Sequence, residues 1–156
     1  MPTLLFKLKN MREKTKRIIV VVISIMFILL FVYAASSKFF EFQKFQVQLS
    51  QSPLLTRNAI LLSWIVPTLE IGISLLLSSE LFRLLGLYLS FSLMILFTGY
   101  IVLITRFSEF IPCSCGGVLQ NLSWNQHLVF NLGFACLGML GVLLFDFPTK
   151  HKQKII

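Results

Sequence analysis

The sequence predicts an all-α integral membrane protein, built as a bundle of four transmembrane helices with both termini in the cytoplasm. Three observations support this fold class. Of the 156 residues, 56% are hydrophobic and only 13% are charged, whereas soluble domains carry about 25% charged residues. Four apolar stretches are each long enough to cross a bilayer. The basic residues behind the net charge of +8 gather near the two termini, where they set membrane orientation rather than bind nucleic acid.

Composition divides the chain into three expected segments. Residues 1–17 form a basic cytoplasmic segment, residues 18–145 form the four-helix membrane domain, and residues 146–156 form a basic cytoplasmic tail. The chain is too short for two domains of ordinary size. The membrane domain is therefore the part in which a functional site is expected, and the lipid bilayer is its first partner.

The first predicted span covers residues 18–35, which contain no charged side chain. A cleaved signal peptide is the alternative, because a basic segment, an apolar run and Ala34-Ala35-Ser36 follow one another in that order. The apolar run is longer than the roughly 7–15 residues of a signal peptide. We therefore expect an uncleaved span.

The segment after this span has helical periodicity. Phe39, Phe42, Phe45 and Leu49 recur at intervals of three or four residues, which predicts one apolar helix face. Two interpretations fit: an amphipathic helix lying in the membrane interface, or an extension of the first helix that packs against its neighbours. Ser52-Pro53 is expected to end the segment.

The second predicted span, residues 58–79, contains Pro67 and Glu70. Pro67 removes a backbone hydrogen bond to the carbonyl of Ser63, which predicts a kink. A carboxyl group at this depth is costly, so Glu70 is expected to face the bundle interior, either protonated or paired, with the neutral form favoured. It would act as a proton relay or as a structural hydrogen-bonding group between helices.

The third predicted span covers residues 84–105. Small residues along it should allow close helix packing; these are Gly86, Ser90, Ser92 and Gly99. Tyr88 and Tyr100 lie near its opposite ends, as interfacial aromatic residues do.

The fourth predicted span covers residues 124–145. One of its helix faces is expected to point inward; it carries His127, Asn131, Ala135 and Gly138. Cys136 falls on a neighbouring face, where a small packing role is expected ahead of a redox role.

The loop between these last two spans carries Cys113-Ser114-Cys115-Gly116-Gly117. Two cysteines this close can form a disulfide only if the chain turns sharply, and the glycine pair permits such a turn. A disulfide across so short a loop is strained and therefore exchange-prone. A redox-active dithiol is the favoured interpretation; a structural bridge, two free cysteines and a Cu(I) site are the alternatives.

The distribution of basic residues predicts on which side of the membrane this loop lies. With both termini cytoplasmic, the inside segments carry ten basic residues and the outside loops carry four, namely Lys38, Lys44, Arg57 and Arg106. The positive-inside rule then places the cysteine loop outside the cytoplasm. Disulfides form and persist in that compartment.

These features resemble the MauE branch of the DoxX-like membrane proteins over about residues 18–145. The resemblance rests on Lys38 soon after the first span, on Glu70 within Val66-Pro67-Thr68-Leu69-Glu70-Ile71-Gly72, and on Cys113-Ser114-Cys115-Gly116-Gly117. The family usually reads Cys-Gly-Cys-Phe-Gly at the last motif, so Ser114 and Gly116 depart from it. The resemblance implies a four-helix bundle in a bacterial inner membrane and a role in thiol–disulfide supply to exported proteins, as in the maturation of methylamine dehydrogenase. The wider DoxX group makes a quinone a candidate cofactor.

We therefore expect a thiol–disulfide oxidoreductase or electron carrier whose Cys113 and Cys115 face the periplasm and exchange with a thioredoxin-like or other exported thiol protein. Gly116 and Gly117 would permit the turn, and no metal is expected at the site. Glu70 and His127 are candidate supporting residues: His127 could favour a cysteine thiolate or simply form an interfacial hydrogen bond. The alternative is a non-enzymatic subunit or scaffold of a membrane complex with a structural dithiol.

Overall fold

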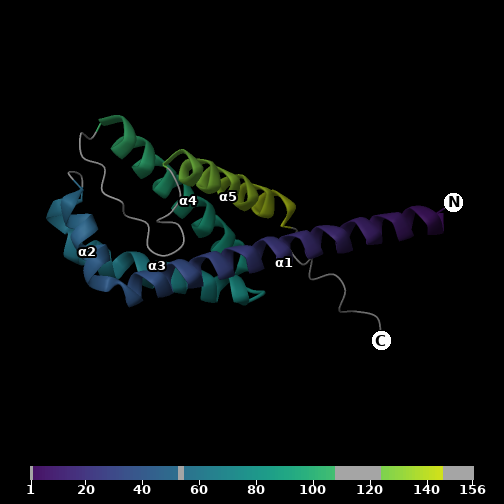
Figure 1. Cartoon of the computed structure of the whole chain (residues 1–156). Helices are drawn as coiled ribbons and strands as arrows, with labels where there is room; N and C mark the ends of the chain where they lie inside the picture. The colour runs from purple at the N-terminus through teal and green to yellow at the C-terminus, as the bar shows by residue number, and fades with distance from the viewer. Residues whose placement is uncertain (1, 53–54, 108–123, 146–156) are drawn as a thin grey trace.

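A computed structural model describes residues 2–52, 55–107 and 124–145 of the chain. These residues form five α-helices and one short 3-10 helix, and the described ranges contain no strand. The elements are α1 (Pro2–Phe40), α2 (Phe42–Gln51), η1 (Thr56–Asn58), α3 (Ala59–Ser78), α4 (Arg83–Phe107) and α5 (Trp124–Leu144). Figure 1 shows their arrangement.

Four of the described helical segments are long and apolar enough to cross a membrane: Glu13–Phe40, Thr56–Ser78, Arg83–Arg106 and Asn125–Leu144. The all-helical, four-span fold expected from the sequence is thereby confirmed. The last three segments differ by at most two residues from the predicted spans. The location of the termini stays a prediction.

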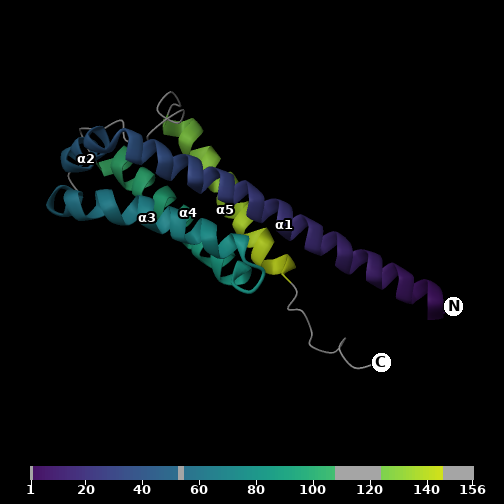
Figure 2. The same ribbon diagram turned by 90° about the horizontal axis from the view of Figure 1, so that it is seen from below.

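The first helix extends beyond the predicted span of residues 18–35. α1 runs without a break from Pro2 to Phe40, so it continues on both sides of residue 17, where the basic segment is predicted to end. The physical reason is that residues 3–40 contain neither proline nor glycine, and nothing interrupts the helical hydrogen bonds. Its N-terminal part extends beyond the other described helices in both views (Figures 1 and 2).

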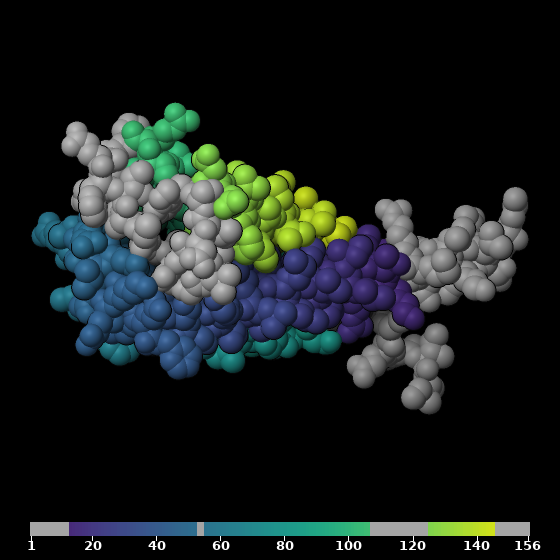
Figure 3. All heavy atoms as spheres, viewed as in Figure 1, coloured from purple at the N-terminus to yellow at the C-terminus, as the bar shows by residue number. Residues whose placement is uncertain are grey.

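The spanning helices bury an apolar core along the length of the bundle. α1 packs against α3 and α5, and α4 packs against the same two helices; Figure 3 shows α1 and α5 side by side on one face. Phe27 of α1 is fully buried, and its ring centroid lies 5.6 Å from that of Phe31 and 5.4 Å from that of Phe134. Many leucine, isoleucine and valine side chains remain exposed on the outside, as expected of a surface that faces lipid.

Only some of the predicted small residues mediate close packing. A Cβ added to Gly86 would lie 2.9 Å from side-chain atoms of Leu77 and 3.0 Å from its backbone nitrogen. Ser90 is buried and donates a hydrogen bond to the Gly86 carbonyl at 2.7 Å. Ser92 and Gly99 are exposed instead, so the packing role expected for these two residues was wrong.

Gly86→Ala is expected to lower the free energy of unfolding by about 1–3 kcal/mol, because the added methyl group overlaps Leu77 where α3 and α4 meet. Gly99→Ala is the matched control on the same helix, since a Cβ there has no atom within 4 Å. The control should be neutral or stabilising through its helix propensity. The free energy of unfolding of both variants is measured by circular dichroism in mixed micelles with increasing dodecyl sulfate. Equal losses from Gly86→Ala and Gly99→Ala would contradict a close contact between Gly86 and Leu77.

The segment after α1 forms a separate helix that packs on α3. The chain leaves the helical geometry at Glu41, and α2 then buries Phe45 and Leu49 against Ala59. The apolar face expected at this spacing is therefore present. It contacts a neighbouring helix, as the packed alternative expected, but α2 is a separate helix and not an extension of α1. The position of α2 relative to the membrane interface stays a prediction.

Candidate functional site

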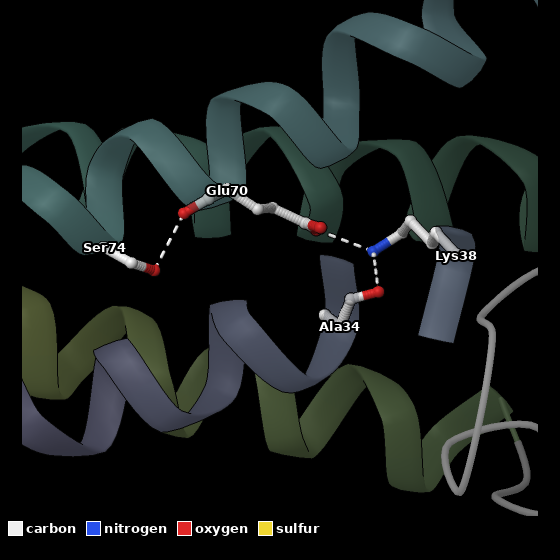
Figure 4. A network of polar contacts seen from close by, with 4 residues as sticks. All are labelled: Ala34, Lys38, Glu70 and Ser74. Atoms are coloured by element: carbon white, nitrogen blue, oxygen red, sulfur yellow. Dashed lines mark hydrogen bonds and ion pairs between the residues drawn. The ribbon is translucent and has the colours of Figure 1, made fainter. Parts of the chain in front are cut away.

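The centre of the candidate site is a buried ion pair between α1 and α3. Lys38 Nζ lies 2.7 Å from Glu70 Oε1, and the two side chains are only 11% and 1% exposed. Lys38 Nζ also lies 3.5 Å from the backbone carbonyl of Ala34, one turn earlier in α1. Figure 4 shows both side chains extending toward one another between the two helices. The inward orientation expected for Glu70 is confirmed.

Helical periodicity explains why Lys38 points inward. Phe27, Phe31 and Ala35 are fully or almost fully buried, and Lys38 continues their spacing of three to four residues along α1. A lysine in the last turn of a helix also lies near carbonyl groups that have no helical donor, which favours a cation there. The inward face of α1 thus continues past the last residue of its uncharged run.

One expectation changes at this ion pair. Lys38 was expected among the basic residues of an outside loop, whereas the structure places it within the first spanning segment. Glu70 was expected to be either protonated or paired, and the structure shows Lys38 as its partner; the preference for the neutral form stays a prediction. The spacing of Lys38 from Phe31 and Ala35 was the signal that could have revealed this partner.

Glu70 lies on the buried face of α3. Ser63, Pro67, Glu70 and Ser74 are all buried on this helix, and the Ser74 hydroxyl donates to the Glu70 backbone carbonyl at 2.9 Å. α3 continues through Pro67, while the kink expected there stays a prediction. The second carboxylate oxygen, Glu70 Oε2, is buried and has no hydrogen-bond partner among the described residues.

A cavity of about 410 Å³ lies beside the ion pair and is lined by residues of all five α-helices. Most of its walls are apolar, and its polar lining residues are Lys38, Glu70, Tyr100, His127 and Asn131. His127 and Asn131 are both buried, which confirms the inward face predicted for α5. Tyr100, near the end of α4, also lines the cavity; its position at the membrane interface stays a prediction.

The structure thus brings two predicted supporting residues, Glu70 and His127, to one cavity. Lys38 and Asn131 complete its polar wall, although the sequence analysis assigned neither a functional role. Asn131 Nδ2 is buried without a hydrogen-bond partner within the described part of the chain. Lys38 pairs with one oxygen of Glu70, whereas the second oxygen and the Asn131 amide nitrogen are buried without a hydrogen-bond partner among the described residues.

The predicted site residues Cys113, Cys115, Gly116 and Gly117 lie outside the described residues. The helix ends that flank their segment are described. Tyr100 and Ile101 near the end of α4, and His127 near the start of α5, line the cavity. The cavity is therefore at the end of the bundle where the chain leaves α4 and enters α5.

Cys136 lies away from this cluster. Its side chain is free and exposed on α5, so it faces the outside of the bundle, where lipid is expected. The packing role expected for Cys136 was wrong, because one further residue along the helix rotates it away from the buried face of Ala135.

A family model described as "Methylamine utilisation protein MauE" matches residues 16–144, most of the chain. The protein belongs to the MauE family. The match contains the Lys38–Glu70 pair, the Cys113-Ser114-Cys115 motif and nearly all of the four spans, so the resemblance seen in the sequence is confirmed. Searches among curated proteins and among solved structures found no match.

Proposed function

We propose that this MauE-family protein is a membrane thiol–disulfide exchange protein in which Cys113 and Cys115 react with thiols of exported partner proteins. One observation carries the proposal: the segment with the two cysteines joins the two helix ends whose residues line the cavity beside the ion pair. The family match over this whole region supports it. A thioredoxin-like or other exported thiol protein is the partner that this chemistry suits.

The exchange is balanced between the two proteins. A partner thiolate attacks one sulfur of the Cys113–Cys115 disulfide, which forms a mixed disulfide and releases the other sulfur as a thiolate. The partner's second thiolate then breaks the mixed disulfide. Two electrons and two protons thereby pass from the partner to the cysteine pair, and the reverse sequence returns them. The relative reduction potentials of the two pairs decide the direction.

The polar cluster supports this reaction by position rather than by direct chemistry. His127 lies near the start of α5, at the end of the bundle from which the cysteine segment extends, and a histidine beside a cysteine favours its thiolate. Glu70 holds Lys38 in place through the 2.7 Å ion pair. The pairing favours the structural role of Glu70 over a proton relay.

The proposed location is a bacterial inner membrane with the cysteine loop facing the periplasm. Because Lys38 is paired inside the bundle, it no longer counts as an outside basic residue. The bias in basic residues then rises from ten against four to ten against three. The quinone raised by the DoxX resemblance and a role in methylamine metabolism stay predictions.

Single cysteine substitutions test the proposed exchange. In cells that express Cys113→Ser or Cys115→Ser, one variant should accumulate a reducible mixed disulfide with an exported protein. The remaining thiolate attacks the disulfide of an oxidised partner, and in this reverse direction the second cysteine of the pair, which would break the adduct, is missing. The adduct is detected on non-reducing gels and identified by mass spectrometry. Both variants should lose exchange activity at unchanged protein levels.

Cys136→Ser is the matched control, since this cysteine is exposed on α5 away from the cavity; it should behave as the unchanged protein. If both single variants keep full activity and form no adduct, the cysteines do not exchange, and the scaffold alternative is supported. If activity falls only in step with protein level, the disulfide is structural.

A further inference from the structure

The cavity beside the ion pair presents one open acceptor and one open donor. Glu70 Oε2 accepts hydrogen bonds and Asn131 Nδ2 donates them, and both atoms are buried without a partner among the described residues. Each buried donor or acceptor that has no hydrogen-bond partner lowers the stability of the protein by about 1–3 kcal/mol. Both residues line the same cavity of about 410 Å³, a volume within the range of small-molecule sites. The two open groups therefore point to a ligand.

The charges around the cavity indicate a neutral head group. The ammonium group of Lys38 and the carboxylate of Glu70 are 2.7 Å apart and balance each other. Apart from Lys38, Glu70 and His127, the described lining residues include no aspartate, glutamate, lysine, arginine or histidine. A charged head group would find no counter-charge there, and burying an unpaired charge is costly.

The walls indicate where such a ligand enters. Three lining residues are also exposed on the outer surface: Ile65 and Leu69 of α3, at 39% and 50%, and Leu96 of α4, at 68%. α3 and α4 touch closely at Leu77 and Gly86 and diverge toward the end of the bundle where α2 lies (Figure 1). Because these exposed lining residues belong to two candidate spanning helices, the side of the cavity that they form is expected to face the hydrocarbon region of the bilayer.

We propose that this cavity binds a neutral, lipid-soluble molecule that enters from the bilayer between α3 and α4. Its head carries a hydroxyl group that donates to Glu70 Oε2 and accepts from Asn131 Nδ2, while its apolar body occupies the opening at Leu69 and Leu96. Two sources share this chemistry: a redox-active ring diol of the quinol class, and a redox-inert lipid alcohol. The site does not depend on the exchange reaction of the cysteines.

Photolabelling of the full-length protein in phosphatidylcholine nanodiscs tests the site. The probe is a diazirine-bearing para-octylphenol, and the competitors are para-octylphenol, its methyl ether and para-octylbenzoate. The phenol should compete at least about tenfold better than the ether, since the ether cannot donate to Glu70 Oε2 and loses one buried hydrogen bond. The benzoate should also compete more weakly. Equal competition by all three, or the tightest binding by the benzoate, would overturn the proposal.

Two variants place the ligand in the structure. Leu69→Trp narrows the opening at a lipid-facing position and should abolish labelling of the cavity, whereas Leu75→Trp, exposed on α3 outside the cavity, should leave it unchanged. Asn131→Leu should lower the affinity for para-octylphenol by about tenfold. Leu132→Ala, at the neighbouring exposed residue, should leave this affinity unchanged. If labelling survives Leu69→Trp undiminished, the ligand does not enter between α3 and α4.

The sources and the cysteine chemistry are separated by two further measurements. Preference of at least about tenfold for octylhydroquinone over octylphenol assigns the site to ring diols, and equal affinity assigns it to lipid alcohols; both results support the site.

The cysteine chemistry is tested separately. Binding of para-octylphenol should be unchanged in the Cys113→Ser/Cys115→Ser double variant. Failure of the exchange experiment would therefore leave this proposal standing, and a negative labelling result would leave the exchange proposal standing.

Discussion

Lys38→Met is expected to lower the free energy of unfolding by about 3–5 kcal/mol, because it leaves the Glu70 carboxylate buried without its counter-charge. Glu70 is 1% exposed, and Lys38 Nζ is the cation that contacts it. Methionine keeps most of the length and volume of the lysine side chain, so the change isolates the charge rather than the packing. Titration with dodecyl sulfate in mixed micelles measures the loss.

The double variant Lys38→Met/Glu70→Leu separates the ion pair from the fold. Replacing a buried pair by apolar side chains of similar size is often neutral or stabilising, so the double variant should recover most of the lost stability. Lys44→Met is the matched control, since Lys44 pairs with Glu41 on the exposed surface at 3.2 Å, and such pairs contribute about 0–1 kcal/mol. If the double variant unfolds as easily as Lys38→Met, apolar side chains cannot replace the ion pair, and the two charges are required for folding.

Phe27→Ala is expected to lower the free energy of unfolding by about 2 kcal/mol. The phenyl ring is fully buried between Phe31 and Phe134, and its tip lies 3.3 Å from the position that a Cβ on Gly138 would occupy. In a bilayer, moving the phenyl ring between lipid and the protein core changes the free energy little, because lipid is as apolar as the core. Packing between the helices therefore provides most of the association energy. A residual cavity on the order of 100 Å³ at about 24 cal/mol per Å³ gives this magnitude.

Phe40→Ala is the control for this prediction. Phe40 lies on the same helix but is 90% exposed, so its removal leaves no internal cavity, and a change within about 0.5 kcal/mol is expected. The same unfolding titration measures both variants. Similar losses from Phe27→Ala and Phe40→Ala would mean that α1 is held by something other than the packing of its inward face.

The hydropathy of the chain by itself determined the fold class and the positions of three spans within two residues. This succeeded because insertion into the bilayer core acts on each apolar segment separately, and a helix is the structure that satisfies every backbone hydrogen bond within one segment. The inward face of α5 at His127 and Asn131 was predictable for a related reason: it depends only on helical periodicity within that segment. Similarly, the cost of a buried carboxyl predicted that Glu70 faces inward.

Only the tertiary structure decided which side chains meet. Lys38 follows the end of the first apolar run and therefore looked like a loop residue, but α1 continues in register and packs against α3, which brings its ammonium group to Glu70. The packing of α2 on α3, the outward position of Cys136 and the cavity that joins Tyr100, His127 and Asn131 likewise depend on how the helices are rotated against one another. That rotation is set by contacts between segments distant in sequence, such as Leu77 against Gly86, and periodicity within one helix carries no information about its partner.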